Sequence, residues 1–267
     1  GVSPEDVKGS VYVLHGGNGD DLQTTQLGVL ESLPAELVAQ FAERRLQFVF
    51  PWVGTSFART AGAADDQDWS GYFWQEIVPA AEGERQHRLR WISGYSMGGQ
   101  SALNLFFRAV DRFQGVSSHF GTLIDFDYSS DEAAREFAAR NRVSDPYLGV
   151  LRDGFTAAFR NRSHFLAHDP ITLVRDLDPS VLVGKTVLFD VGSDDEFGLA
   201  EGARTLSRVL SERGVQHDFV EVPDGHHDGA FVQQRFASRL AMLLAPANAV
   251  SGQASARGAE KSRDLHA

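Results

Sequence analysis

Short apolar runs alternate along the chain with segments in which apolar residues recur every three or four positions. The short runs predict buried strands, and they are 11–14, 46–50, 89–93, 115–118, 187–191 and 219–222. Helical spacing is found in 33–41, 102–110, 131–140, 199–210 and 232–243. Strands that alternate with helices are typical of βαβ units. We therefore expect an α/β fold with a mostly parallel central sheet and helices on both of its faces.

The alternation breaks between about residues 120 and 169. This stretch is polar, rich in Arg, Asp and Phe, and carries helical patterns such as 131–140. We interpret it either as an insertion over the carboxyl edge of the sheet or as a peripheral helical excursion. Residues 246–267 are rich in Ala, Ser, Gly and charge, which predicts a disordered C-terminal tail. Residues 1–245 are expected to form a single domain.

The composition excludes several classes of protein. At 42% hydrophobic and 23% charged residues the chain is typical of a globular domain, and no stretch approaches the roughly 18 apolar residues of a membrane span. A formal charge of −11 would repel nucleic acid and anionic membranes. The absence of cysteine excludes disulfides, thiolate catalysis and Cys-ligated zinc. The first ten residues lack the features of a signal peptide, which favours a cytoplasmic location, although a trimmed N-terminus would look the same.

The clearest local motif is GYSMGG at residues 94–99, which follows a predicted strand and precedes a predicted helix. A sharp strand-to-helix turn would strain the backbone of Ser96 and project its hydroxyl above the sheet. The N–H of Met97, at the start of the helix, would then point to where an oxyanion forms. The alternative is a glycine-rich turn with an incidental serine.

A serine nucleophile needs a base, and the base needs an acid that orients it. The strand 187–191 is followed by GSDDE, and the strand 219–222 by PDGHHD. Both loops lie at the carboxyl edge, where the chemistry of parallel sheets gathers. The residues leave open whether the acid is Asp194 or Asp195, and whether the base is His226 or His227. Neighbouring histidines make zinc conceivable, but without cysteine or an HExxH motif no metal is expected.

The first predicted strand ends in HGGNG at residues 15–19. Glycines let backbone N–H groups approach a substrate, so we expect the second oxyanion donor to be Gly17, with Asn18 as the second choice. A tight turn without a ligand is the alternative. Because the segment has neither a Walker lysine nor a GxGxxG pattern, no cofactor is expected.

Together these motifs resemble the esterase D-like branch of the α/β-hydrolases, which includes S-formylglutathione hydrolases, feruloyl esterases and trehalose mycolyltransferases. The resemblance runs from about residue 11 to residue 244, and the segments that carry it are YVLHGGNGDD, WQEIVP, GYSMGG, DVGSDDEF and GHHDGAF. It implies the α/β-hydrolase fold, to which the segment 120–169 would add a helical insertion over the active site. It also implies that Asp195 is the acid and that His227 is the base.

The chain departs from that branch in three places. Gly229 follows Asp228 where family members usually carry an aromatic residue, which bears on the shape of the substrate pocket. Only about ten residues precede the first strand, where family members have further strands. The segment 120–169 matches the family poorly, and we expect it to set specificity.

We therefore expect a serine carboxylic-ester hydrolase that acts on small or medium acyl esters through an acyl-enzyme. Ser96, Asp195 and His227 would form its triad, and Met97 and Gly17 its oxyanion hole. An acyltransferase that passes the acyl group to a sugar hydroxyl is the alternative within the same fold. The alternative from another class of function is a non-catalytic binding module on the same fold. The expected partner is a small-molecule ester, and the oligomeric state stays open.

Overall fold

The computed structural model of the chain describes residues 3–17, 19, 22, 28–31, 33–61, 67–83 and 89–245. The predicted tail 246–267 and the candidate Asn18 lie outside the described residues.

Six strands form one sheet in the order β2-β1-β3-β4-β5-β6, and every neighbouring pair is parallel. The predicted α/β class is confirmed, and in the described part of the chain the sheet is wholly rather than mostly parallel. β1, β4 and β5 are buried along their whole length, as expected where helices cover both faces. The strands are β1 (Gly9–Leu14), β2 (Leu46–Val49), β3 (Leu89–Tyr95), β4 (Gly115–His119), β5 (Thr186–Gly192) and β6 (Asp218–Val222).

The register aligns the carboxyl ends of the central strands. Tyr95 at the end of β3 pairs with His119 at the end of β4, and His119 pairs with Asp190 in β5. Gly192 at the end of β5 pairs with Val222 at the end of β6. The loops that follow these strands therefore leave the sheet at one common edge, which is where we expected the functional residues.

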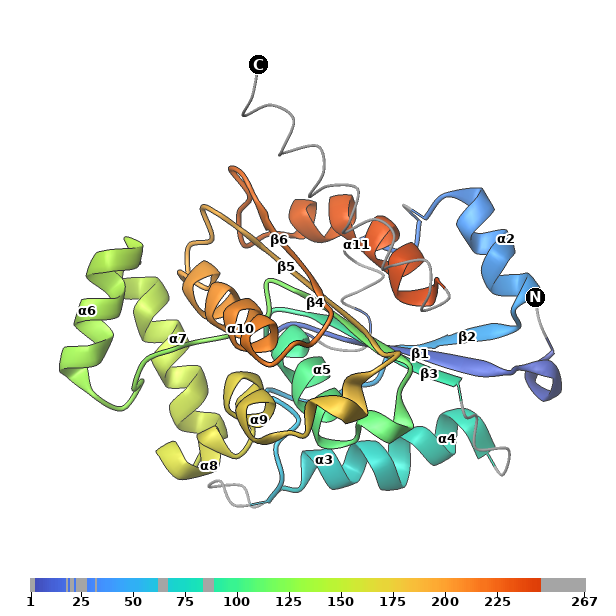
Figure 1. Cartoon of the computed structure of the whole chain (residues 1–267), viewed down its shortest axis with the longest axis horizontal. Helices are drawn as coiled ribbons and strands as arrows, with labels where there is room; N and C mark the ends of the chain where they lie inside the picture. Colours follow the sequence, from blue (N-terminus) through green and yellow to red (C-terminus); the bar gives the residue numbers. More distant parts are fainter. Residues whose placement is uncertain are drawn as a thin grey trace.

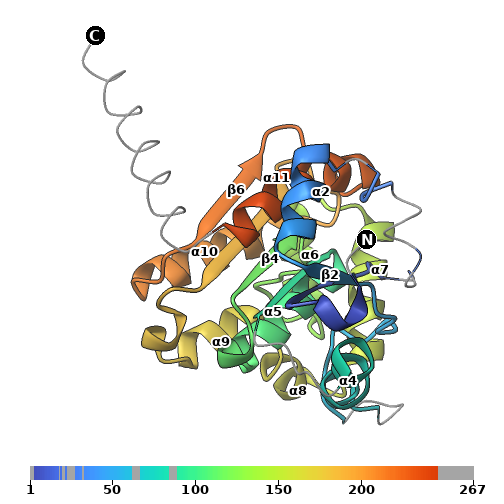
Figure 2. The same ribbon diagram turned by 90° about the vertical axis from the view of Figure 1, so that its right-hand side faces the viewer.

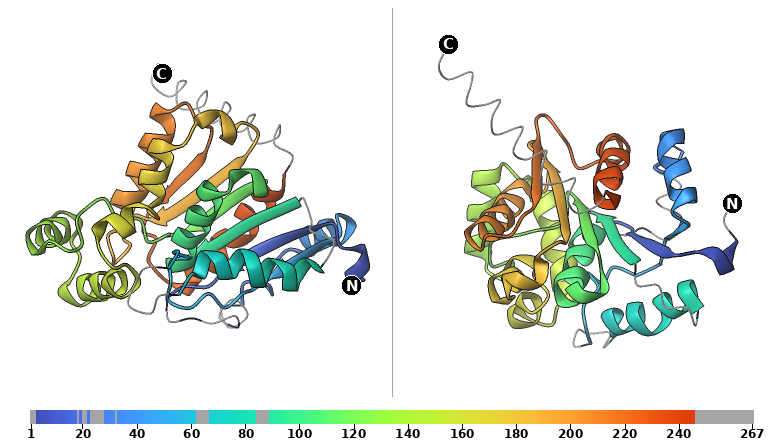
Figure 3. Two further views of the ribbon diagram at one scale, coloured as in Figure 1. Left: turned by 90° about the horizontal axis from the view of Figure 1, so that it is seen from below. Right: turned by 45° about the vertical axis from the view of Figure 1, so that its right-hand side comes forward.

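Helices cover both faces of the sheet. α2 (Ala35–Glu43) and α11 (Gly229–Leu244) lie on one face, and α5 (Met97–Arg108), α9 (Pro170–Asp176) and α10 (Ala200–Glu212) lie on the other (Figures 1 and 3). Figure 2 shows the same layers from a perpendicular direction, with α2 and α11 opposite α9. A helical segment made of α3 (Trp69–Tyr72), a π-helical turn (Phe73–Ile77) and α4 (Val78–Glu82) leads into β3. Short 3-10 turns occur at Pro4–Asp6, Val110–Arg112 and Pro179–Leu182.

The irregular segment after β4 forms three helices that stand to one side of the sheet (Figure 1, left). They are α6 (Asp131–Asn141), α7 (Asp145–Ala158) and α8 (Arg162–Leu166). An aromatic cluster fixes α7 and α8 to the body of the fold. The ring of Phe155 in α7 stacks on Phe57 with centroids 5.0 Å apart, and it lies edge-on to Phe165 in α8 at 5.2 Å. This packing, which no local sequence pattern indicates, decides where α7 lies.

None of the helices within the described residues combines the length and the apolar composition that a membrane span requires.

Candidate active site

Ser96 lies between the end of β3 and the start of α5 with φ 54° and ψ −125°. A non-glycine residue in this region is strained by about 1–3 kcal/mol. The turn is so tight that a Cβ atom at Gly98 would lie 2.3 Å from the carbonyl oxygen of Leu14. A Cβ atom at Gly94 would lie 2.3 Å from the carbonyl oxygen of Gly98. The two glycines of the motif are therefore required by close approach of the backbone.

Contacts from β4 and the loop after it hold this strained turn. The Ser96 N–H donates to the carbonyl oxygen of His119 at 3.0 Å. The Ser96 carbonyl oxygen accepts from the N–H of Thr122 at 3.1 Å and from that of Gln100 at 3.2 Å. The bonds to His119 and Thr122 thus fix the Ser96 backbone from β4 and from the loop after it, and the hydroxyl has a defined position above the sheet.

The structure brings Ser96, His227 and Asp195 together. The Ser96 Oγ is 2.9 Å from Nε2 of His227, and Nδ1 of His227 is 2.8 Å from Oδ2 of Asp195. The Asp195 side chain is 0% exposed and that of His227 is 11% exposed. Because Asp195 accepts at Nδ1, the proton of a neutral imidazole resides there, and Nε2 is left to accept from the serine hydroxyl.

The other oxygen of Asp195 is held by its own loop. Oδ1 accepts from the N–H of Phe197 at 3.0 Å and from that of Leu199 at 3.4 Å. These bonds satisfy the buried carboxylate. Asp194, the alternative acid, meets the neighbouring loop through its backbone instead, since its N–H donates to the carbonyl oxygen of Gly225 at 3.0 Å.

Glu196 orders the loop that carries His227, and the sequence patterns did not single it out. Its Oε2 accepts from the backbone N–H of His227 at 2.9 Å, and its Oε1 binds Nδ1 of His226 at 2.9 Å. Burial raises the pKa of Glu196, but the hydrogen bonds from His227 and His226 outweigh it and lower that pKa overall. The hydrogen bond to Glu196 and its charge raise the pKa of His226.

His226 binds Glu196, and 53% of its side chain is exposed, whereas His227 is the histidine that contacts Ser96. Replacing it in the variant His226→Gln is expected to leave kcat/KM for ester hydrolysis within about threefold of wild type, because exposed ion pairs contribute little. Steady-state kinetics with a p-nitrophenyl ester measure this. A loss as large as that of the corresponding His227 variant would contradict the placement of the two histidines.

Two phenylalanine rings flank the imidazole of His227. The centroid of Phe120 lies 4.2 Å from that of the imidazole, and Phe197 lies edge-on at 4.7 Å. Phe120 also contacts Phe231 in α11 at 5.2 Å. The Asp228 side chain accepts from the Phe231 N–H at 2.9 Å and so caps α11, which begins at Gly229. The aromatic support of the base thus comes from positions 120 and 197, which no sequence motif indicated.

A cavity of about 650 Å³ opens at the serine. Both candidate oxyanion donors, Gly17 and Met97, line it. As the first residue of α5, Met97 has no intrahelical acceptor for its N–H. The remaining walls come from α7 and from the loops after β2, β4, β5 and β6. Within the described residues the lining is Gly17, Thr55, Phe57, Ser96, Met97, Thr122, Val150, Leu151, Asp153, Gly154, Ala157, Phe197, Leu199 and His227.

His15 ties the Gly17 loop to the segment after β2. The ring of His15 is buried, and its Nε2 accepts a hydrogen bond of 3.1 Å from the backbone N–H of Val53. Its Nδ1 lies 2.8 Å from the carbonyl oxygen of Gly16. Since Nε2 accepts, the proton of the ring is on Nδ1 and is donated to Gly16. The histidine of the HGG sequence thus shapes the rim of the cavity.

A second cavity, of about 490 Å³, lies between α2 and β2. Its walls within the described residues contain neither an acid, a base nor a nucleophile, and they consist of Val7, Leu30, Leu33, Val38, Phe41, Ala42, Leu46, Gln47 and Phe48. In the described part of the chain no three His, Asp or Glu side chains are arranged to hold a metal ion.

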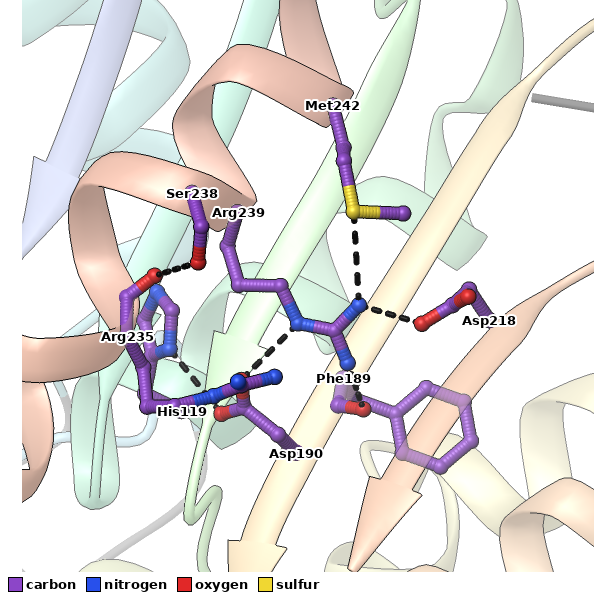
Figure 4. A network of polar contacts seen from close by, with 8 residues as sticks. All are labelled: His119, Phe189, Asp190, Asp218, Arg235, Ser238, Arg239 and Met242. Atoms are coloured by element: carbon purple, nitrogen blue, oxygen red, sulfur yellow. Dashed lines mark hydrogen bonds and ion pairs between the residues drawn. The ribbon is translucent and has the colours of Figure 1, made fainter. Parts of the chain in front are cut away.

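A buried ionic network lies behind the site and joins β4, β5, β6 and α11 (Figure 4). Oδ1 of Asp190 lies 3.0 Å from Nδ1 of His119. Its Oδ2 accepts from Nε of Arg239 at 2.9 Å and from Nε of Arg235 at 3.2 Å. Arg239 also binds Asp218. Burial raises the pKa of Asp190, but His119 and Arg239 outweigh it and lower that pKa to about 2. The network therefore holds together β5 and β6, the strands whose following loops carry Asp195 and His227.

The described sheet is wholly parallel, and a serine lies at a strained turn between a strand and a helix. A carboxylate and a histidine in the loops after later strands complete the arrangement. Together these features define an α/β-hydrolase. The chain belongs to the esterase family whose model is described as "Putative esterase" and matches residues 40–243. The predicted resemblance to the esterase branch of the α/β-hydrolases is confirmed, and the chain is an ester hydrolase by family. No curated protein matches it.

Solved structures share the fold at low sequence identity. A ferulic acid esterase is 22% identical with a TM-score of 0.68, over 90% of this chain and 86% of that one. An S-formylglutathione hydrolase from Agrobacterium tumefaciens is 15% identical with a TM-score of 0.64, over 89% and 83%. MPT51 (FbpC1) of Mycobacterium tuberculosis is 16% identical with a TM-score of 0.64, over 89% of each chain. At these identities the similarity establishes the fold.

Proposed function

We propose that this esterase hydrolyses carboxylic esters through an acyl-enzyme on Ser96. The observation that carries the proposal is the unbroken chain of hydrogen bonds from Asp195 through His227 to the Ser96 hydroxyl, at 2.8 and 2.9 Å. A serine hydroxyl is a weak nucleophile on its own, and this arrangement supplies both a base and a group that orients the base.

In the first half-reaction the Ser96 oxygen attacks the ester carbonyl while Nε2 of His227 takes the hydroxyl proton. The imidazolium that forms is stabilised by the buried carboxylate of Asp195. The tetrahedral oxyanion is held by the backbone N–H groups of Met97 and Gly17, and the N-terminal end of α5 adds a favourable dipole. His227 then gives its proton to the leaving alcohol, and the acyl group remains on Ser96.

In the second half-reaction a water molecule attacks the acyl carbon while His227 takes the proton of that water. The bond between the acyl carbon and the Ser96 oxygen then breaks, His227 returns its proton to that oxygen, and the free acid leaves. The rim of the cavity supports water as the acceptor. Val150 is 60% exposed, and Asp153 and Ala157 are exposed as well, so solvent reaches the site. Transfer to a sugar hydroxyl would need a site that excludes water.

The substrate we propose is a small-molecule ester with a small or medium acyl group. A cavity of about 650 Å³ lies within the usual range of small-molecule sites, and most of its lining residues are apolar. We also propose that the segment 120–169 acts as an insertion over the active site rather than as a peripheral excursion. The observation in favour is that α7, in the middle of this segment, lines the cavity together with Ser96.

The purified chain is expected to release p-nitrophenol and free butyrate from p-nitrophenyl butyrate, with free acid as the main product even when glucose is present as an acceptor. Absorbance follows the phenol, and mass spectrometry of the products identifies the acyl acceptor. A sugar ester as the main product would favour the acyltransferase. The absence of any ester cleavage would contradict the proposal.

A further inference from the structure

Helix α7 presents one face to the cavity at Ser96. Leu151, Gly154 and Ala157 follow one another at intervals of three residues on this face, and all three line the cavity. Leu151 is buried and Ala157 is exposed, so this face of α7 runs from the interior of the cavity to its rim. Gly154 lies between them, in the interior of the helix.

Glycine carries no side chain, so Gly154 leaves open the space that another residue would fill on the cavity side of the helix. A Cβ atom added to Gly154 would meet no heavy atom of the described residues within 4 Å. At Gly202 in α10, by contrast, an added Cβ atom would lie 2.1 Å from the carbonyl oxygen of Leu123, so packing requires a glycine there. The space beside Gly154 is therefore space of the cavity itself.

We infer that Gly154 sets the width of the substrate cavity, and that the substrate carries a bulky, apolar, non-anionic group beside its scissile bond. The inference rests on the function proposed above and names the substrate class of the same site. Such a group would contact the apolar side chains of Phe57, Leu151 and Phe197, which line the cavity. Asp153 at the rim is exposed and has no ion pair within the described part of the chain, so it disfavours a carboxylate on the substrate.

The chain contains a matched control for this position. Gly149 lies in the same helix, and an added Cβ atom there also meets nothing within 4 Å of the described residues, but Gly149 does not line the cavity. A leucine at either position changes helix propensity equally. The variants Gly154→Leu and Gly149→Leu therefore differ in whether the new side chain enters the cavity, and Gly154→Ala gives an intermediate size.

The experiment measures kcat/KM of these variants with two series of esters. One series keeps p-nitrophenol and enlarges the acyl group from acetate through butyrate to benzoate and octanoate. The other keeps acetate and enlarges the alcohol from ethanol to benzyl alcohol, with proton release followed by titration. The two series distinguish a bulky acyl group from a bulky alcohol. Labelling of Ser96 by a small ethoxy fluorophosphonate reports whether the nucleophile is intact.

In Gly154→Leu the loss of kcat/KM should grow with the size of the group in at least one series. It should reach tenfold or more for the largest member, since a single methylene in an apolar pocket is worth roughly 10–200-fold. The smallest esters and the small fluorophosphonate should be affected least by Gly154→Leu. Gly154→Ala should lose less than Gly154→Leu, and Gly149→Leu, whose position does not line the cavity, should lose nothing. A loss in Gly154→Leu that is independent of size in both series, or an equal loss in Gly149→Leu, would overturn the inference while the esterase proposal stands. A wild-type chain that neither cleaves esters nor is labelled would overturn both.

Discussion

Replacing Ser96 by alanine is expected to lower kcat for p-nitrophenyl butyrate by about 10⁴-fold or more, because the loss of the nucleophile removes the acyl-enzyme route altogether. The strained turn and the cavity would remain, so the variant should keep its fold. A fluorophosphonate probe should add to Ser96 in the wild-type chain, and peptide mass spectrometry should find no adduct in the variant.

The same helix provides a control for this substitution. Ser101 is fully buried in α5 and its hydroxyl donates to the carbonyl oxygen of Met97 at 2.8 Å, but it does not line the cavity. Ser101→Ala should therefore keep most of the activity. Retained ester turnover in Ser96→Ala, or an adduct on another residue of the wild-type chain, would remove Ser96 from the proposed mechanism.

Replacing Arg239 by methionine is expected to lower the free energy of unfolding by about 3–5 kcal/mol, the usual loss when one partner of a buried ion pair is removed. The guanidinium of Arg239 binds Asp190, Asp218 and the carbonyl oxygen of Phe189, and its side chain is 2% exposed. Its removal leaves the wholly buried Asp190 carboxylate with less compensation. Urea unfolding followed by circular dichroism at pH 7 measures the change.

Arg208→Met is the matched control, because among the described residues Arg208 makes only an exposed pair with Glu212, one turn along α10. Such pairs contribute about 0.3–0.5 kcal/mol. Equal losses in the two arginine variants would contradict a structural role for the network in Figure 4.

The pH dependence of stability gives a second readout of the network. The pKa of Asp190 in the folded chain is lowered to about 2 from an ordinary value of 3.8. A carboxyl group with a lowered folded-state pKa stabilises the fold above its unfolded-state pKa, and this contribution is lost as the pH falls through the folded-state value. Stability should therefore fall between about pH 4 and pH 2, and this component should be absent in Asp190→Asn. An identical acid profile in that variant would show that the folded chain does not lower the pKa of Asp190.

The alternation of apolar runs predicted all six strands, since a strand buried on both faces leaves a local apolar signature. The register of the sheet was not predicted, but parallel connectivity made a common carboxyl edge the expected result. The helix α7 was not predicted from its own residues. Its place depends on rings such as Phe57 and Phe155, which are far apart in the sequence and meet only in the fold.

The turn at Ser96 and the two loops that hold the proposed acid and base could be predicted from the sequence, because glycine spacing and strand order are local or sequential properties. Between neighbours such as Asp194 and Asp195 the residues left the choice open, and only the resemblance favoured one of each pair. The folded chain turns the side chain of Asp195 toward His227 and leaves His226 exposed, because the loops after β5 and β6 meet at Glu196 and Gly225. No local pattern specifies the rings beside the imidazole, the buried ionic network behind it or the open space at Gly154. Each of these features depends on how elements distant in the sequence pack in the folded chain.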